Sequence, residues 1–210
     1  MDAGLLAVKR LDAAKSRLAS RFSDQDRLSI ARALFDDALE LCRGTTHLRW
    51  WIVSDDQDVV DQARGRGFET MKDTGSGLND AITTSARALT EMGASSVTVL
   101  PCDIPLATPE DLLDIADTGE LSDIVVVPSE GDGGTNALYL RPPEVITPLF
   151  GPGSLTRHIR AAERAGLRCS VLPLERLELD LDTPADIDTF LRADPPTTLK
   201  TAELLRKLTA

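Results

Sequence analysis

The sequence of 210 residues is poor in aromatic side chains, cysteine and histidine. Aromatic residues make up only 4% of the chain, so the core must consist mainly of Leu, Val, Ile and Ala. The three cysteines, Cys42, Cys102 and Cys169, are odd in number and have no Cys-x-x-Cys spacing, which indicates neither a disulfide framework nor a zinc cage. The two histidines belong to no cluster of metal ligands, so we assign neither to catalysis and expect His47 in a loop and His158 on a helix surface.

Positive charge and long apolar runs are also scarce. The 23 Lys and Arg residues are outnumbered by 34 Asp and Glu residues, which gives a net charge of −11. This charge has the wrong sign for nucleic acid or an anionic membrane, so we expect neither as a partner. After the short apolar run at 5–8 the chain reaches Lys9 and Arg10, and no stretch approaches the roughly 18 apolar residues of a membrane span. We therefore expect a cytoplasmic protein.

Short apolar runs alternate with longer amphipathic segments along the chain, which is typical of an α/β fold. The pattern predicts strands at 5–8, 50–54, 68–71, 96–101, 123–127, 136–140, 168–172 and 177–181, and helices at about 24–43, 57–66, 79–92, 109–116, 154–165, 184–191 and 201–208. We predict one domain over residues 1–193, with three layers around a mostly parallel sheet. The Pro-containing join after Asp194 then opens a C-terminal extension, 194–210, with a short surface helix.

Three aspartates follow predicted strands, at the sheet edge where such folds bind ligands. Asp180 and Asp182 end the strand predicted at 177–181, and the side-chain period of two projects both carboxylates from one face. Asp103 follows the strand predicted at 96–101. Three converging carboxylates would hold Mg²⁺, which keeps positions open for substrate phosphates. The alternative that these aspartates are helix caps stays open.

Four cations come directly after the first predicted strand of this acidic chain. They are Lys9, Arg10, Lys15 and Arg17. Lysine supplies a point charge and arginine a two-pronged donor, which together suit a triphosphate. A solvated helix face is the alternative, but the position after the first strand favours anion binding.

Three glycine-containing loops could bring the backbone close to a ligand. Residues 73–79 lead into a helix and offer the Asn79 amide, residues 131–136 form a second loop, and residues 150–154 open a helix whose free N–H groups suit a small anion. Cys102 lies beside Asp103, whose charge should raise the thiol pKa, so covalent catalysis is not expected.

Six ordered motifs between residues 5 and 191 resemble the guanylyltransferase family of coenzyme F-420 biosynthesis. They are AVKRLDAAKSRL, GSGLNDA, PCDIPL, GGTNALYLRPP, FGPGS and LDLDTPADI. The resemblance implies a three-layer, Rossmann-like nucleotidyltransferase fold of the glycosyltransferase-A type. It also implies transfer of GMP from GTP to phosphoenolpyruvate or 2-phospho-L-lactate with release of pyrophosphate; 3-phosphoglycerate is not distinguished from these acids.

Carried over residue by residue, the resemblance implies a role for each motif. It implies acid binding by Thr135, Gly151 and Ser154, Mg²⁺ binding by Asp103, Asp180 and Asp182, phosphate binding by Lys9, Lys15 and Arg17, and ribose and base binding by Gly77, Leu78 and Asn79. Asp103, Lys15 and Arg17 are the expected catalytic residues. The alternatives are another nucleotidyltransferase, of molybdopterin or sugar-phosphate type, and a catalytically silent nucleotide-binding protein. A homodimer is a possible assembly.

Overall fold

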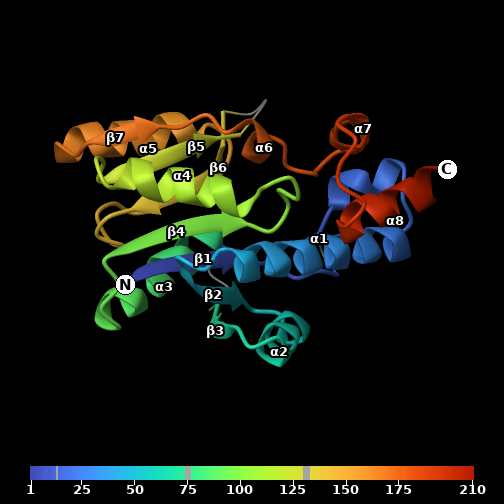
Figure 1. Cartoon of the computed structure of the whole chain (residues 1–210), viewed down its shortest axis with the longest axis horizontal. Helices are drawn as coiled ribbons and strands as arrows, with labels where there is room; N and C mark the ends of the chain where they lie inside the picture. The colour runs from blue at the N-terminus through green and yellow to red at the C-terminus, as the bar shows by residue number, and fades with distance from the viewer. Residues whose placement is uncertain (13, 74–76, 130–132) are drawn as a thin grey trace.

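The computed structural model describes residues 1–12, 14–73, 77–129 and 133–210. Within these residues, seven strands form one sheet in the order β3-β2-β1-β4-β6-β5-β7 (Figure 1). The strands are β1 (Asp2–Ala7), β2 (Arg49–Ser54), β3 (Glu69–Lys72), β4 (Ser96–Pro101), β5 (Ile124–Pro128), β6 (Thr135–Leu140) and β7 (Cys169–Val171). Strand β6 is antiparallel to β4 and β5, and the other neighbouring pairs are parallel. The predicted mostly parallel sheet is confirmed.

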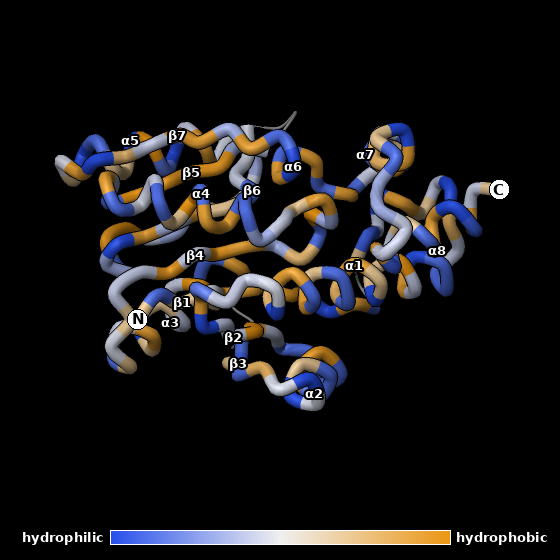
Figure 2. Tube along the Cα trace, in the orientation of Figure 1, coloured by the Kyte–Doolittle hydropathy of each residue, from blue (hydrophilic) through white to orange (hydrophobic). Residues whose placement is uncertain are grey.

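Helices cover both faces of the sheet. They are α1 (Asp24–Gly44), α2 (Gln57–Gly65), α3 (Leu78–Glu91), α4 (Pro109–Gly119), α5 (Ser154–Ala165), α6 (Glu175–Glu178), α7 (Pro184–Arg192) and α8 (Lys200–Thr209). Leu6 packs with α1, α2 and α4 in one apolar cluster, whereas its neighbour Leu5 packs with α3 and α5 in another. This alternation is the side-chain period of a strand covered on both sides, and hydrophobic residues run along β4 and β5 (Figure 2). The predicted three layers are confirmed.

A third apolar cluster lies beside the sheet, around the N-terminal half of α1 (Figure 1). It joins Leu18 from the 3-10 helix η1 (Ser16–Ser20), Ile30 and Leu34 from α1, Phe190 from α7, and Leu205 from α8. Asp37 of α1 accepts the backbone N–H groups of Lys200 and Thr201, both at 2.9 Å, and so caps α8. The last helix is therefore packed against α1 as well as capped by it.

Element by element, the predicted pattern matches the structure except at one strand and at the 3-10 helix η1, which was not predicted. The segment predicted as a strand at 177–181 is the short helix α6 followed by irregular chain. Its apolar residues belong to two different clusters. Leu177 packs in the cluster that contains Leu6, α2 and α4, whereas Leu181 packs in the third cluster with α1 and α7. The segment therefore runs from one apolar cluster to the other and adds no strand to the sheet. Asn136 of β6 holds its turn by donating to the carbonyls of Leu177 and Glu178.

No helix in the described part of the chain is both long and apolar enough to cross a membrane.

Candidate active site

The site lies at the carboxyl ends of β1 and β4. A cavity of about 560 Å³ opens there, and the residues around it include Lys9, Lys15, Leu78, Asp103 and Asp182. Because parallel strands end at the same edge of a sheet, the segment after β1 and the turn after β4 meet at this point. The volume is within the usual range of pockets that take a small ligand or cofactor.

The ammonium of Lys15 lies between two aspartates. Lys15 Nζ is 2.8 Å from Asp103 Oδ2 and 2.9 Å from Asp182 Oδ1, and the lysine side chain is only 6% exposed. Arg17 reaches Asp182 Oδ2 at 3.3 Å from a side chain that is 70% exposed. Burial alone would lower the pKa of Lys15, but Asp103 and Asp182 raise it above its ordinary value. Lys15 is thus a fixed positive charge at the base of the cavity.

The third aspartate is close enough to the other two to be affected by their charges. Burial, followed by the charges of Asp103 and Asp182, raises the pKa of Asp180 to about 6. Burial would also raise the pKa of Asp182, but Lys15 and the other nearby cations lower it below its usual range. Asp180 and Asp182 lie on irregular chain, so the predicted cause of their proximity, a shared strand face, is wrong. What ties this segment to β4 is a 3.0 Å hydrogen bond from Leu181 N–H to the Asp103 carbonyl.

The segment after β1 that carries Lys9, Arg10, Lys15 and Arg17, here called the cation segment, contains a residue in the left-handed backbone conformation. Lys15 adopts φ 58° and ψ 34°, a left-handed conformation that costs a residue with a Cβ about 1 kcal/mol or more. The helix η1 starts at the next residue, with Leu18 N–H donating to the Lys15 carbonyl at 3.0 Å and the Leu18 side chain fully buried. The strained turn points Lys15 back at the aspartates while Leu18 anchors the chain in the third cluster.

The residues expected to bind the acid come together at the start of α5. Ser154 Oγ donates to Thr135 Oγ1 at 2.9 Å, and Ser154 N–H donates to the Gly151 carbonyl at 3.0 Å. Gly151 has φ 121° and Gly153 has φ 70°, so the turn requires glycine at both positions. Thr135 and Ser154 are buried and lie apart from the lining of the 560 Å³ cavity, which Phe150 reaches. Of the second glycine loop, residues 131 and 132 lie outside the described residues.

The residues expected at the ribose and base divide into two groups. Gly77 and Leu78 line the cavity, whereas residues 74–76 of the same motif lie outside the described residues. The Asn79 side chain accepts Phe150 N–H at 2.7 Å and donates to the Phe150 carbonyl at 3.2 Å. Asn79 therefore links the start of α3 to the loop that carries Gly151, a contact the sequence pattern did not predict.

The predicted surface position of His158 is wrong, whereas His47 lies in an exposed turn as expected. His158 is fully buried, with Nδ1 3.1 Å from Thr135 Oγ1 and Nε2 accepting Leu149 N–H at 2.9 Å. The signal that points inward is its spacing from Ser154. Residues four apart share a helix face, and Ser154 faces the interior.

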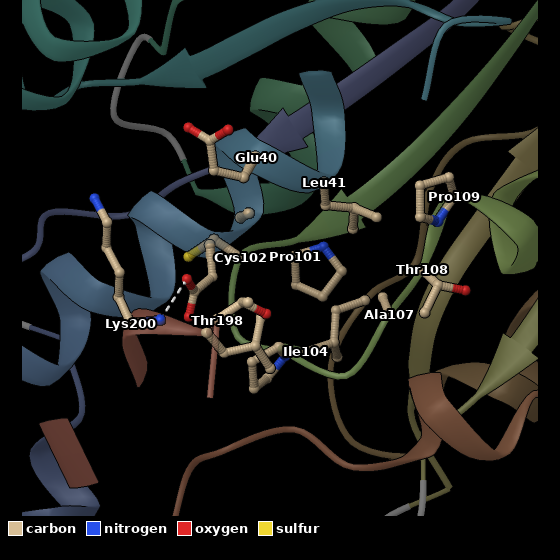
Figure 3. A pocket seen from close by; sticks show the side chains of 14 residues that line it. Glu40, Leu41, Pro101, Cys102, Ile104, Ala107, Thr108, Pro109, Thr198 and Lys200 are labelled. Atoms are coloured by element: carbon tan, nitrogen blue, oxygen red, sulfur yellow. Dashed lines mark hydrogen bonds between the residues drawn. The ribbon is translucent and has the colours of Figure 1, made fainter. Parts of the chain in front are cut away.

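A second cavity, of about 400 Å³, lies between α1, the turn after β4 and residues 198–200 (Figure 3). Pro101 and Cys102 line both cavities. The charges at its edge are already paired: Lys200 Nζ with Asp36 at 2.9 Å, and Glu40 with Arg43 and Arg66. Burial and then Asp103 raise the pKa of Cys102 to about 12, the direction predicted, so the thiol form is favoured over the nucleophilic thiolate at neutral pH.

Comparison with known proteins identifies the family. Residues 3–210 match the sequence model of the family described as "Guanylyl transferase CofC like". The chain belongs to this CofC-like family. A phosphoenolpyruvate guanylyltransferase from Rubrobacter xylanophilus is 36% identical over 87% of this chain and 90% of its own. A 3-phospho-D-glycerate guanylyltransferase from Phenylobacterium zucineum is 32% identical over 99% of this chain and 97% of its own. The CofC-like protein is therefore a nucleotidyltransferase, as the motifs implied.

Solved structures show the same fold as the CofC-like chain. A Desulfovibrio desulfuricans protein described as a nucleotide-diphospho-sugar transferase has a TM-score of 0.82 at 19% identity, covering 98% of this chain and 94% of its own. A Mycobacterium tuberculosis protein solved in complex with manganese has a TM-score of 0.59 at 14% identity, covering 91% of this chain and 98% of its own. The predicted nucleotidyltransferase fold is confirmed.

Proposed function

We propose that this CofC-like protein transfers GMP from GTP to the phosphate of a small phosphorylated three-carbon acid and releases pyrophosphate. The acid is phosphoenolpyruvate, 2-phospho-L-lactate or 3-phosphoglycerate, and the reaction belongs to coenzyme F-420 biosynthesis. The observation that carries the proposal is the buried Lys15 ammonium between Asp103 and Asp182 at a cavity of nucleotide-binding size. The names of the two relatives, a phosphoenolpyruvate and a 3-phospho-D-glycerate guanylyltransferase, support the same class of acid.

The reaction needs charge compensation more than it needs a base. The second pKa of a phosphate monoester is near 6, so the attacking oxygen is already ionised at neutral pH. Two unit charges 4 Å apart repel by about 4 kcal/mol at an effective dielectric of 20, and here both reactants are polyanions. The site must therefore offer cations along the path of the phosphates.

The carboxylates of Asp103, Asp180 and Asp182 suit a hard divalent cation, which we propose is Mg²⁺. Among the described residues no three acidic, cysteine or histidine side chains are already arranged as a metal cage. The donors nevertheless fit by their chemistry, because burial and then the charges of Asp103 and Asp182 raise the pKa of Asp180, and a nearby cation would offset both effects. When bound, Mg²⁺ would supply positive charge to the reacting α-phosphate.

Three cations of the segment after β1 would hold the triphosphate. Lys15 already lies beside the carboxylates, so its charge acts on any phosphate bound there. Arg17 is exposed enough to fold over the β- and γ-phosphates, and Lys9 lines the cavity. Lys15 and Arg17 would stabilise the negative charge that develops on departing pyrophosphate.

The acid would bind at the start of α5, where Thr135, Gly151 and Ser154 meet. The Thr135 hydroxyl, which accepts from Ser154 and keeps its own proton to donate, and the positive end of the dipole of a twelve-residue helix are suitable partners for a carboxylate or phosphate. The base would lie near Gly77 and Leu78 in the cavity.

The test is a panel of GTP, ATP, CTP and UTP against the three acids with Mg²⁺, scored by pyrophosphate release. We expect release only when GTP and one of the acids are both present. Release with CTP or UTP but not GTP would move the protein to the sugar-phosphate type of nucleotidyltransferase. GTP binding without release for every acid would contradict the proposal.

A further inference from the structure

Three buried side chains are joined by hydrogen bonds next to the loop of residues 150–154, where the acid is proposed to bind. His158 Nδ1 lies 3.1 Å from Thr135 Oγ1, and Ser154 Oγ donates to the same oxygen at 2.9 Å. His158 and Ser154 are fully buried and Thr135 nearly so. The imidazole thus contacts Thr135, one of the residues proposed to bind the acid, and nothing in the proposed function so far uses the ring.

The hydrogen bonds of the ring assign its protons. Leu149 N–H donates to His158 Nε2 at 2.9 Å, so Nε2 carries a lone pair and the proton of the neutral ring is on Nδ1. Nδ1–H then donates to Thr135 Oγ1, which also accepts from Ser154. Thr135 Oγ1 therefore accepts two hydrogen bonds, and its own hydroxyl proton is left to donate elsewhere.

We propose that His158 is a positioning residue for the phosphorylated acid: it fixes Thr135 so that the threonine hydroxyl donates to the acid's anionic group. The inference rests on the proposed function. The same ring also holds the loop that carries Gly151, through Leu149 N–H and through an edge contact with the Phe150 ring, centroid to centroid 5.5 Å. One imidazole thereby sets both the donor hydroxyl and the glycine turn.

The surroundings of His158 keep the ring neutral. Burial, and then the positive charge of Arg157, lower its pKa to about 4. Arg157 is the neighbouring charged group, and its guanidinium donates to the carbonyls of Leu149 and Pro152. Phe150, Thr135 and Ser154 bring no charge to the ring. The proton arrangement is therefore the same across the neutral pH range.

Two substitutions separate the two contacts of the ring. In His158→Asn the amide nitrogen falls near the position of Nδ1 and can still donate to Thr135. In His158→Gln the amide oxygen falls near Nε2, so the contact with Leu149 N–H is kept and the donor to Thr135 is lost. Both changes are uncharged, and Arg160→Ala on the exposed face of α5 is the matched control.

The experiment measures KM for GTP and for the best of the three acids in each variant. We expect His158→Gln to raise KM for the acid about tenfold, the loss of one hydrogen bond, with KM for GTP nearly unchanged. His158→Asn should stay within about threefold of wild type, and Arg160→Ala should match wild type. Equal effects of Asn and Gln, or an equal rise in both KM values, would reduce His158 to a structural residue and overturn the inference.

A second readout needs no turnover. Long-range ¹H–¹⁵N spectra of the imidazole at pH 7 should show neutral His158 with its proton on Nδ1. An imidazolium, or a proton on Nε2, would overturn the inference even in an inactive protein. Failure of the proposed function looks different, because it appears in the wild type as no pyrophosphate release with any acid.

Discussion

Lys15 contacts Asp103 and Asp182 from a side chain that is 6% exposed, and it does so from a left-handed backbone. Neither property follows from the spacing of cations in the sequence, which predicted a phosphate contact only. The aspartates were found by their position after predicted strands, and Asp103 does follow β4. The inward position of His158 was missed because a lone histidine on a helix gives no signal unless the face of Ser154 is known.

Asp182→Asn should abolish most of the turnover. The change removes one of the charges that Lys15 and a metal ion would share, so we expect kcat to fall by roughly a hundredfold or more. The fold should persist, because Lys15 keeps Asp103 as a partner. Asp188→Asn is the matched control, since Asp188 lies on α7 and pairs only with Arg21 among the interactions described. Wild-type turnover in Asp182→Asn would remove this carboxylate from the site.

Lys15→Ala should affect both GTP use and folding. Removing the buried cation leaves Asp103 and Asp182 uncompensated, which we expect to lower the free energy of unfolding by about 3 kcal/mol. Arg17→Ala should lower kcat/KM for GTP with little change in stability, because Arg17 is exposed. Urea denaturation and GTP kinetics on both variants check this. An unchanged kcat/KM for GTP in Lys15→Ala would exclude Lys15 from nucleotide binding.

At the scale of elements, the third apolar cluster supports the site from outside the sheet. Leu18 follows the cation segment and Leu181 lies between Asp180 and Asp182, and both are fully buried in this cluster. Helices α1, α7 and α8 supply the rest of it. The helix caps were predictable, since Ser23, Thr108 and Thr183 are each the first residue of a capping box. The path of residues 177–181 was not predictable, because an alternating apolar pattern fits a strand and also fits a segment whose apolar residues pack in two different clusters.

Leu205→Ala should therefore weaken the fold and disturb the site. The side chain is fully buried between α8 and α1, so we expect a loss of about 3 kcal/mol in the free energy of unfolding. Lys207→Ala, exposed on the same helix, should change it by less than about 0.5 kcal/mol. The measurement is the denaturation midpoint of each of these two variants. Equal midpoints would mean that α8 adds little to the fold.

At the scale of the whole molecule, the sheet brings together segments about 170 residues apart. The order β2-β1-β4 places the turns after β1 and β4 side by side, and the chain returns with Asp180 and Asp182 only after β7. Strand periodicity predicted the layers and most of the strands. It did not predict which charges would pair across the site, because such contacts depend on turns whose course local sequence does not fix.

The stability of the molecule should depend on pH through His158. Its pKa is about 4 in the folded protein and near 6.5 when unfolded, so the unfolded chain binds the proton first as pH falls. The contribution of His158 to the free energy of unfolding, about 3 kcal/mol, is fully present above pH 6.5 and is lost as the pH falls to about 4. Asp180, whose pKa is raised to about 6, acts in the opposite sense. Over this range His158→Asn should show a shallower loss of unfolding free energy than wild type; parallel curves would contradict the assignment.

The most direct test of the account is the product of the wild-type reaction. GTP, Mg²⁺ and each of the three acids are incubated with the protein, and the mixture is read by mass spectrometry and ³¹P NMR. The account predicts one guanosine joined through a diphosphate to one of the acids, with one pyrophosphate released for each GTP consumed. GTP left intact with all three acids, or cleaved to GDP and phosphate, would contradict it.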